Sequence, residues 1–127
     1  MKKLFLLFLF FTITVFAIAD NGVKTSTESG RYEIIQGSIS AVFTFKLDKY
    51  TGAVYQLESD ENNDLSWRRM QVIGDLDEKI NTNTINYQIY LSGLTMKNCF
   101  LINIHTGRTW CLYLDKVTEK HFWYPFN

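Results

Sequence analysis

The sequence is poor in the residues on which most small active sites and metal sites depend. It has one proline, two cysteines and two histidines among 127 residues, and neither Cys-x-x-Cys nor Gly-x-Ser-x-Gly occurs. His105 lies at a predicted hairpin tip and His121 just before the last predicted strand, so their spacing does not bring them together. We therefore predict no catalytic residues, no metal site and no cofactor, and we expect that the protein is not an enzyme.

The sequence also lacks an excess of charge of either sign. Its 13 basic residues balance its 13 acidic ones. Without Lys2 and Lys3 the basic count falls to 11, which leaves a net charge of −2. Because no basic stripe is present, we predict no nucleic-acid partner. The single proline and the 16% aromatic content also exclude a disordered chain.

A long apolar run occurs only at the N-terminus. It extends from Leu4 to Ile18, follows Lys2 and Lys3, and ends at Ala17-Ile18-Ala19, the small-residue pattern read by signal peptidase. A membrane span needs about 20 apolar residues, so an uncleaved anchor is the less favoured alternative. We predict a signal peptide over 1–19, a secreted or periplasmic protein, and no membrane contact after cleavage.

The remaining chain contains two copies of one unit, residues 31–72 and 86–127, offset by 55 positions without a gap. About two or three identities are expected by chance over such a window. The identities include Tyr32/Tyr87, Ile34/Ile89, Phe45/Phe100, Thr51/Thr106, Gly52/Gly107 and Leu57/Leu112. The ungapped alignment also places Tyr55 with Trp110 and Trp67 with Phe122. A duplicated module therefore sets the architecture.

Alternation of apolar and polar residues with a period of two predicts strands throughout both copies. Residues 20–30 are polar and aperiodic, which predicts a flexible tail. Gly52 follows Thr51 at a predicted hairpin turn. The predicted strand segments cover 32–35, 43–48, 53–57 and 67–73, then 87–91, 99–104, 109–114 and 122–126. We expect six main strands, three in each repeat, with one or two short additional strands.

The predicted fold is all-β: a small closed antiparallel barrel of two three-strand repeats related by pseudo-twofold symmetry. A three-strand sheet with one apolar face is not stable alone, so residues 31–127 should form one domain, with a tight sandwich as the alternative to the barrel. The alternation predicts that nine apolar residues point inward: Phe43, Phe45, Leu47, Tyr55, Leu57, Phe100, Ile102, Trp110 and Leu112.

Cys99 and Cys111 lie on the two arms of the second hairpin. If Asn103 pairs with Gly107, the two cysteines lie directly opposite each other, within the reach of a disulfide. An exported chain with two cysteines favours this pairing. The alternative is two unpaired thiols, which a register shifted by one residue would produce.

Two further patterns have a structural and a functional interpretation. Residues 60–64 match the first oxygens of a calcium loop but continue with Leu65 and Gln71 where Gly and Glu are required, so a solvated acidic hairpin is favoured. The tryptophans could form a sugar- or peptide-binding platform. Trp110 and Trp67 are expected in the core, while Trp123 and Tyr124 are adjacent, so one of them should face outward.

The module resembles one found in many exported bacterial proteins, in which an Asp-Thr-x-Thr-Gly-x-x-Trp hairpin precedes a closing Trp. The match is carried by Phe45, Leu47, Asp48, Thr51, Gly52, Tyr55, Leu57 and Trp67 and by Phe100, Ile102, Thr106, Gly107, Trp110, Leu112 and Phe122. Lys49 after Asp48 and Asn103-Ile104 in the second copy depart from it. In size, signal peptide and duplicated β-modules the chain is also similar to potempins, small exported β-barrel inhibitors of secreted proteases.

These resemblances imply a secreted, non-catalytic binding protein, most specifically an inhibitor that occludes secreted endopeptidases with a loop or tail. The alternative is a structural or assembly module of the bacterial cell envelope with a protein partner. The expected contacts are the two hairpin tips, at Lys49 and Tyr50 and at His105 and Arg108, together with Trp123 and the tail over 20–30. Solvated turns without a binding role are the simpler interpretation of the tips.

Overall fold

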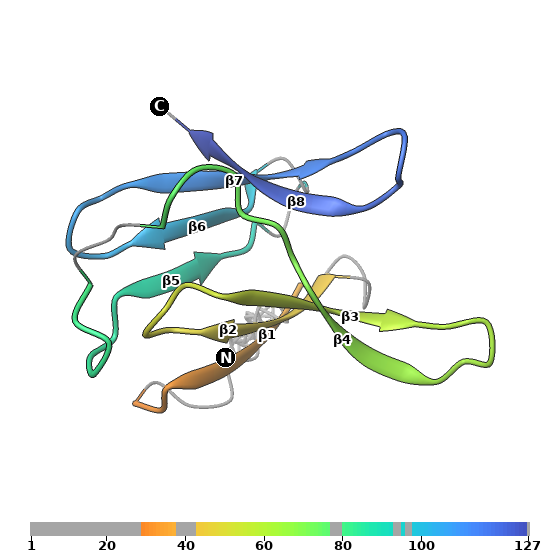
Figure 1. Ribbon diagram of the computed structural model, residues 1–127, viewed down its shortest axis with the longest axis horizontal. Coiled ribbons are helices and arrows are strands. Elements are labelled where there is room, and N and C mark those ends of the chain that lie inside the picture. Colours follow the sequence, from red (N-terminus) through yellow and green to blue (C-terminus); the bar gives the residue numbers. More distant parts are fainter. Residues whose placement is uncertain (1–28, 38–42, 77–79, 93–94, 96–97, 127) are drawn as a thin grey trace, which may run out of the picture.

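The computed structural model describes residues 29–37, 43–76, 80–92, 95 and 98–126 (Figure 1). Within these residues the chain is all-β, as predicted, and forms no helix. The predicted signal peptide and most of the predicted tail lie outside the described residues. The eight strands are β1 (Tyr32–Gln36), β2 (Thr44–Asp48), β3 (Val54–Ser59), β4 (Leu65–Arg69), β5 (Tyr87–Tyr90), β6 (Phe100–Asn103), β7 (Thr109–Leu114) and β8 (His121–Phe126).

The strands form two antiparallel sheets of four strands, in the orders β1-β2-β3-β4 and β5-β6-β7-β8. The expectation of three main strands in each repeat is therefore wrong. Residues 60–64 and 115–120 form tight connections, closed by the bonds Asp60 N to Asp64 O and Asp115 N to Lys120 O. Because each connection is tight, the strand that follows pairs back and becomes a fourth strand.

The two sheets pack face to face and do not close into the predicted barrel. Among the described residues, each strand ladder stays within its own sheet, and one isolated parallel bridge joins Val72, in the chain after β4, to Trp123 of β8. In Figure 1 the green chain after β4 crosses from the first sheet to the second. The core between the sheets contains Ile35, Phe45, Leu47, Val54, Met70, Tyr87, Leu91, Cys99, Leu101, Trp110, Leu112 and Trp123.

A four-residue turn determines the register of the central hairpin in each sheet. The amide of Gly52 donates to the Asp48 carbonyl at 2.8 Å, and the Asp48 amide donates to the Ala53 carbonyl at 2.9 Å. The side chain of Asp48 also accepts a bond from the Tyr50 amide. Gly52 has a φ of +76°, which a residue with a Cβ adopts at a cost. The spacing of Asp48, Thr51 and Gly52 is thus explained by turn formation.

The second hairpin repeats this turn at the same offset. The Gly107 amide donates to the Asn103 carbonyl at 2.8 Å, and the Asn103 amide donates to the Arg108 carbonyl at 2.9 Å. Asn103 Oδ1 accepts bonds from the amides of His105 and Thr106. Asn103 therefore pairs with Arg108 and not with Gly107, so the register differs by one residue from the prediction.

This shift by one residue changes which residues of the two hairpin strands share a face, so the predicted inward sets of β2 and β3, and of β6 and β7, cannot both face the core. Because side chains alternate between faces, a one-residue slip exchanges the buried and outer sets of a strand. Phe45 pairs with Gln56, and Phe100 pairs with Cys111. The expectation that Tyr55, Leu57, Phe100 and Ile102 point inward is therefore wrong, and Val54, Gln56 and Leu101 are buried instead.

Each sheet has two faces, which we name by their largest residues. The Phe face carries Ile35, Phe45, Leu47, Val54 and Gln56 in the first sheet and Tyr90, Phe100, Ile102, Thr109, Cys111, Tyr113, Phe122, Tyr124 and Phe126 in the second. The Trp face carries Tyr32, Ile34, Lys46, Tyr55, Leu57 and Trp67 in the first sheet and Tyr87, Ile89, Leu101, Trp110, Leu112 and Trp123 in the second.

The first sheet buries its Phe face and the second sheet buries its Trp face. Phe45 is 0% exposed whereas Phe100 is only half-buried, and Tyr87 is 0% exposed whereas Tyr32 is 52% exposed. A pseudo-twofold axis would place equivalent residues in equivalent surroundings. The predicted pseudo-twofold symmetry is therefore not confirmed, because the core joins unlike faces of the two sheets.

The ungapped repeat also fails in the last strand. Leu57 pairs with Trp67, whereas Leu112 pairs with Trp123 and not with Phe122. The connection before β8 has one residue more than the connection before β4, which moves the structural counterpart of Trp67 to Trp123. Asn63 and Glu119, each with positive φ, occupy corresponding places in the two connections.

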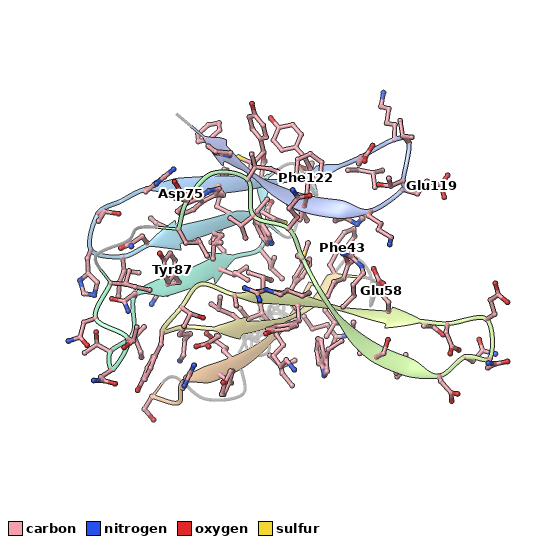
Figure 2. All side chains as sticks on the ribbon, viewed as in Figure 1. Phe43, Glu58, Asp75, Tyr87, Glu119 and Phe122 are labelled. Atoms are coloured by element: carbon pink, nitrogen blue, oxygen red, sulfur yellow. The ribbon has the colours of Figure 1, made fainter. Side chains whose placement is uncertain are left out.

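The hairpin tip of the first sheet packs against the start of the second sheet. The Lys49 carbonyl accepts bonds from the amides of Asn86 and Tyr87, at 2.8 and 2.9 Å. Asn86 Nδ2 donates to the carbonyl of Tyr50 at 2.9 Å. Tyr87 lies between the sheets in Figure 2, with its ring against Gly52. The turn therefore sets the register within one sheet and also supports contact with the other.

We predict that Gly52→Ala destabilises the protein more than Gly107→Ala. Both positions have positive φ, which costs about 1–2 kcal/mol for alanine. A Cβ at Gly52 would also lie 3.0 Å from the Tyr87 ring, whereas a Cβ at Gly107 meets nothing within 4 Å. Overpacking should add about 1–3 kcal/mol at Gly52 alone. Equal losses of unfolding free energy in urea titrations would contradict the docking of this tip.

The imidazole of His121 makes the stability depend on pH. Its ring packs edge-on against Phe43, with 5.6 Å between centroids, and Nε2 is buried without a hydrogen-bond partner. Burial lowers the pKa of His121 below 6.5; nearby Arg68 lowers the pKa further, and Glu58 opposes this effect. The unfolded state therefore binds the proton more readily, so the stabilisation is complete above about pH 6.5 and is lost as pH falls.

We predict that the unfolding free energy decreases between about pH 7 and pH 5 and that His121→Gln removes this decrease. Paired urea titrations of the wild type and the variant across this range measure the effect. An unchanged slope in His121→Gln would show that another group is responsible.

Candidate binding surface

Six aromatic rings stand together on the Phe face of the second sheet, which points away from the core. Four of them are exposed by half or more of their surface, and Tyr90, the most exposed, reaches 61%. Figure 2 shows ring side chains, including that of Phe122, on the outer side of this sheet. The six residues are Tyr90, Phe100, Tyr113, Phe122, Tyr124 and Phe126.

The six rings form two clusters of three, and the rings within each cluster are in contact. Phe100 lies 6.4 Å from Tyr90 and 5.7 Å from Phe126, measured between ring centroids. In the second cluster Tyr113 lies 6.2 Å from Phe122 and 5.7 Å from Tyr124. Aromatic pairs at these separations stabilise one another beyond simple burial of area. The rings are thus held in place before any partner binds.

Cys111 lies between the two clusters. It pairs with Phe100 on β6 and with Tyr124 on β8, so both neighbours cover its small side chain. Burial raises the pKa of the Cys111 thiol, which keeps it protonated and weakly nucleophilic at neutral pH. The centre of this face is therefore apolar and unreactive.

None of the described strand residues on this face carries a charge. Its remaining members are Gln88, Ile102 and Thr109, beside the six aromatics and Cys111. Isolated exposed apolar residues are ordinary on protein surfaces, but contiguous patches mark interaction sites. The exposed Phe face of the second sheet is therefore the best candidate binding surface.

The Trp face of the first sheet is also exposed, and it has a different chemistry. Lys46 Nζ lies 4.7 Å from the ring centroid of Tyr55 and 5.0 Å from that of Trp67. The Arg31 guanidinium lies 5.1 Å from the ring centroid of Tyr32. Cations held over rings in this way are attracted by the aromatic quadrupole. This face therefore combines aromatic rings with positive charge.

The hairpin tip at Lys49 and Tyr50 does not protrude as predicted. Lys49 is only 2% exposed, and its Nζ lies 3.9 Å from a carboxylate oxygen of Glu33. Tyr50 is half-buried beside Arg31, whose guanidinium lies 5.5 Å from its ring centroid. The expectation of an exposed tip is wrong here because the second sheet packs against this turn.

The second tip, with His105 and Arg108, is exposed. His105 Nε2 lies 3.0 Å from the Ile85 carbonyl, and the Arg108 guanidinium lies 5.1 Å from the ring centroid of Trp110. Both side chains are therefore tied to neighbouring parts of the chain. Both residues belong to the turn between β6 and β7 and not to the exposed Phe face.

Trp123, predicted as a partner contact, is 0% exposed. Its ring packs edge-on against Phe45 at 6.0 Å, in the core between the sheets. The adjacent Tyr124 faces outward and is 50% exposed. Alternation predicted one inward and one outward residue, and the residue that faces outward is Tyr124.

The predicted disulfide between Cys99 and Cys111 is absent, and both residues are free and buried. The Leu112 amide donates to the Cys99 carbonyl at 3.1 Å, so Cys99 lies opposite Leu112 on the core side. Cys111 lies opposite Phe100 on the outer side. The one-residue shift in register therefore separates the two thiols onto different faces.

The described residues offer little for metal or small-molecule chemistry. They contain no group of three or more His, Cys, Asp or Glu side chains that could hold a metal ion. In the acidic connection, Asp60 Oδ1 accepts bonds from the amides of Asn62 and Asp64, so this oxygen is used by the turn. A shallow pocket lies beside the chain that follows β4, lined by Ala53, Arg69, Met70, Gln71, Val72, Gly74, Asp75 and Leu76.

We predict that the denatured, non-reduced protein contains two titratable thiols. In the native protein both should react slowly, because both are buried and burial raises the pKa of each. Titration with a chromogenic disulfide reagent, with and without denaturant, measures both quantities. Absence of free thiol after denaturation would show that Cys99 and Cys111 are bonded and that the register of β6 and β7 is incorrect.

No described segment forms a helix long and apolar enough to span a membrane. Comparison of the chain with protein-family models, with curated proteins and with solved structures finds no significant match. The candidate surface is therefore defined by its own geometry: a sheet face whose described strand residues are uncharged and that carries two clusters of three aromatic rings.

Proposed function

We propose that the protein is a non-catalytic, protein-binding module that acts in assembly of the bacterial cell envelope after export. The observation that carries this proposal is the exposed Phe face of the second sheet. Aromatic residues are enriched and charged residues depleted at the centres of protein interfaces. Rings that are already packed lose little conformational entropy on binding, which favours a protein partner for this face.

The position of the six rings on one sheet face favours a protein over a small molecule. Small-molecule sites are usually concave and enclose most of the ligand. The six rings lie instead on one face of a sheet, at alternate positions along β5, β6, β7 and β8. Another sheet face is the partner that would cover them most completely.

Inhibition of endopeptidases receives less support than assembly. A loop that occludes a protease cleft must extend from its scaffold, and the tip at Lys49 is buried. The tip at His105 and Arg108 is exposed, but its side chains contact Ile85 and Trp110. We therefore favour the assembly module, and an assay against exported endopeptidases would separate the two functions.

We predict that a photo-crosslinking amino acid on the exposed Phe face captures a protein partner in the exporting cell. Replacement of Tyr124 or Tyr113 by p-benzoylphenylalanine should give discrete adducts after irradiation, because a bound partner would cover both positions. Electrophoresis and mass spectrometry identify the adducts.

The matched control places the same photo-crosslinker at Val117, which is 91% exposed but lies in the connection between β7 and β8. This variant should give no discrete adduct. Equal adducts at Val117 and Tyr124, or none at either face position, would contradict the proposal.

A further inference from the structure

The core of this protein is a contact between unlike faces. The Phe face of the first sheet, with Phe45 and Leu47, packs on the Trp face of the second sheet, with Trp110 and Trp123. The other Phe face and the other Trp face of the same chain both point away from this core. On that Trp face Tyr32 and Ile34 are exposed, while Lys46, Tyr55, Leu57 and Trp67 are half-buried. Each chain therefore has one Phe face and one Trp face on its outside, and a Phe face packed on a Trp face is the contact that forms its own core.

The exposed faces retain the apolar character of their buried counterparts. On the exposed Trp face, Ile34, Leu57 and Trp67 correspond in register to Ile89, Leu112 and Trp123 of the core. On the exposed Phe face, Phe100 and Ile102 correspond to the buried Phe45 and Leu47. Solvent exposure alone does not account for apolar residues at these positions, because polar residues on an outer sheet face would form the same ladders.

The main difference between buried and exposed faces is charge, and it favours the same contact. Where the buried Trp face has Leu101, the exposed Trp face has Lys46. Among the described strand residues, the exposed Phe face has no charge and carries three tyrosine rings: Tyr90, Tyr113 and Tyr124. Positive charge on one face and aromatic rings on the other are complementary. Two Trp faces would instead bring lysines together.

We infer that the partner of the exposed Phe face is the exposed Trp face of a second copy of this chain. The inference rests on the proposed function and names its partner. Because the contact joins unlike faces, a bound pair leaves one face of each kind free, and further copies can add in the same way. Stacked sheets lie about 10 Å apart, so each chain would extend such a stack by about 20 Å.

The test compares the wild type with two variants, each of which disables one face. Tyr113→Lys/Tyr124→Lys places positive charge on the exposed Phe face, and Tyr32→Gln/Ile34→Gln removes apolar surface from the exposed Trp face. All four substituted residues are exposed outside the core. Circular dichroism and urea titration establish that each variant is folded, and Val117→Lys is the control for a charge placed elsewhere.

Sedimentation velocity should give a wild-type mass that increases with concentration without reaching a plateau. Each variant alone should be monomeric, whereas an equimolar mixture should reach a plateau at two chains, since one contact between intact faces is possible. Val117→Lys should associate like the wild type. This pattern is specific to a contact between unlike faces.

Three results would overturn the inference. The first is a wild type that stays monomeric up to about 1 mM, where a complex with a Kd of that value is half assembled. The second is dimerisation of either variant alone, which would show that like faces pair. The third is a mixture of the variants that remains monomeric.

The photo-crosslinking experiment separates failure of this inference from failure of the proposed function. If the photo-crosslinker at position 124 gives adducts with a different protein and the wild type is monomeric, the proposed binding function is supported and self-association is rejected. If no adducts form and the wild type is monomeric, both the proposed function and the self-association are rejected.

Discussion

The four-residue turn after Asp48 is the constraint on which the arrangement of the first sheet depends. Its main-chain bonds, the side chain of Asp48 and the positive φ of Gly52 together fix the pairing of β2 with β3. Because alternation has a period of two, this pairing decides which residues of β3 face inward. The same turn exposes the Lys49 carbonyl to the amides of Asn86 and Tyr87, which joins the sheets.

The second sheet has the same turn and nearly the same registers but buries its other face. Side-chain charge accounts for the choice. The Trp face of the second sheet has Leu101 where that of the first has Lys46, and burying the ammonium group of a lysine without a partner is costly. The two sheets have corresponding registers but bury opposite faces. The face of the second sheet that corresponds to the buried face of the first is therefore on the outside, and it carries the six rings.

Much of the fold could be predicted from the sequence, because alternation and turn residues are local signals. The all-β class, the positions of the strands and the turns at Gly52 and Gly107 followed from these signals. The register did not, because a three-residue and a four-residue turn are both compatible with Asp-x-x-Thr-Gly. That one-residue difference explains the errors at Tyr55, Leu57, Phe100 and Ile102 and the incorrect disulfide.

The candidate surface was harder to predict, because it depends on which face of each sheet is buried. The aromatic residues of β8 were recognised, but Trp123 and not Tyr124 was named as a partner contact. An extra residue in the connection before β8 places Trp123, and not Phe122, opposite Leu112, and the ungapped repeat concealed this. The chemical signal that was available is Lys46, whose charge marks the first Trp face as the outer one.

The central claim is that the two sheets bury unlike faces, and nuclear Overhauser effects between aromatic rings test it most directly. In protein with selectively labelled aromatic residues, the ring of Phe45 should show contacts with Trp123, whose centroid lies 6.0 Å away. The ring of Phe100 should show contacts with Tyr90 and Phe126 and none with the first sheet. Contacts between Phe45 and Phe100 would instead indicate that like faces meet in the core, and they would contradict this account.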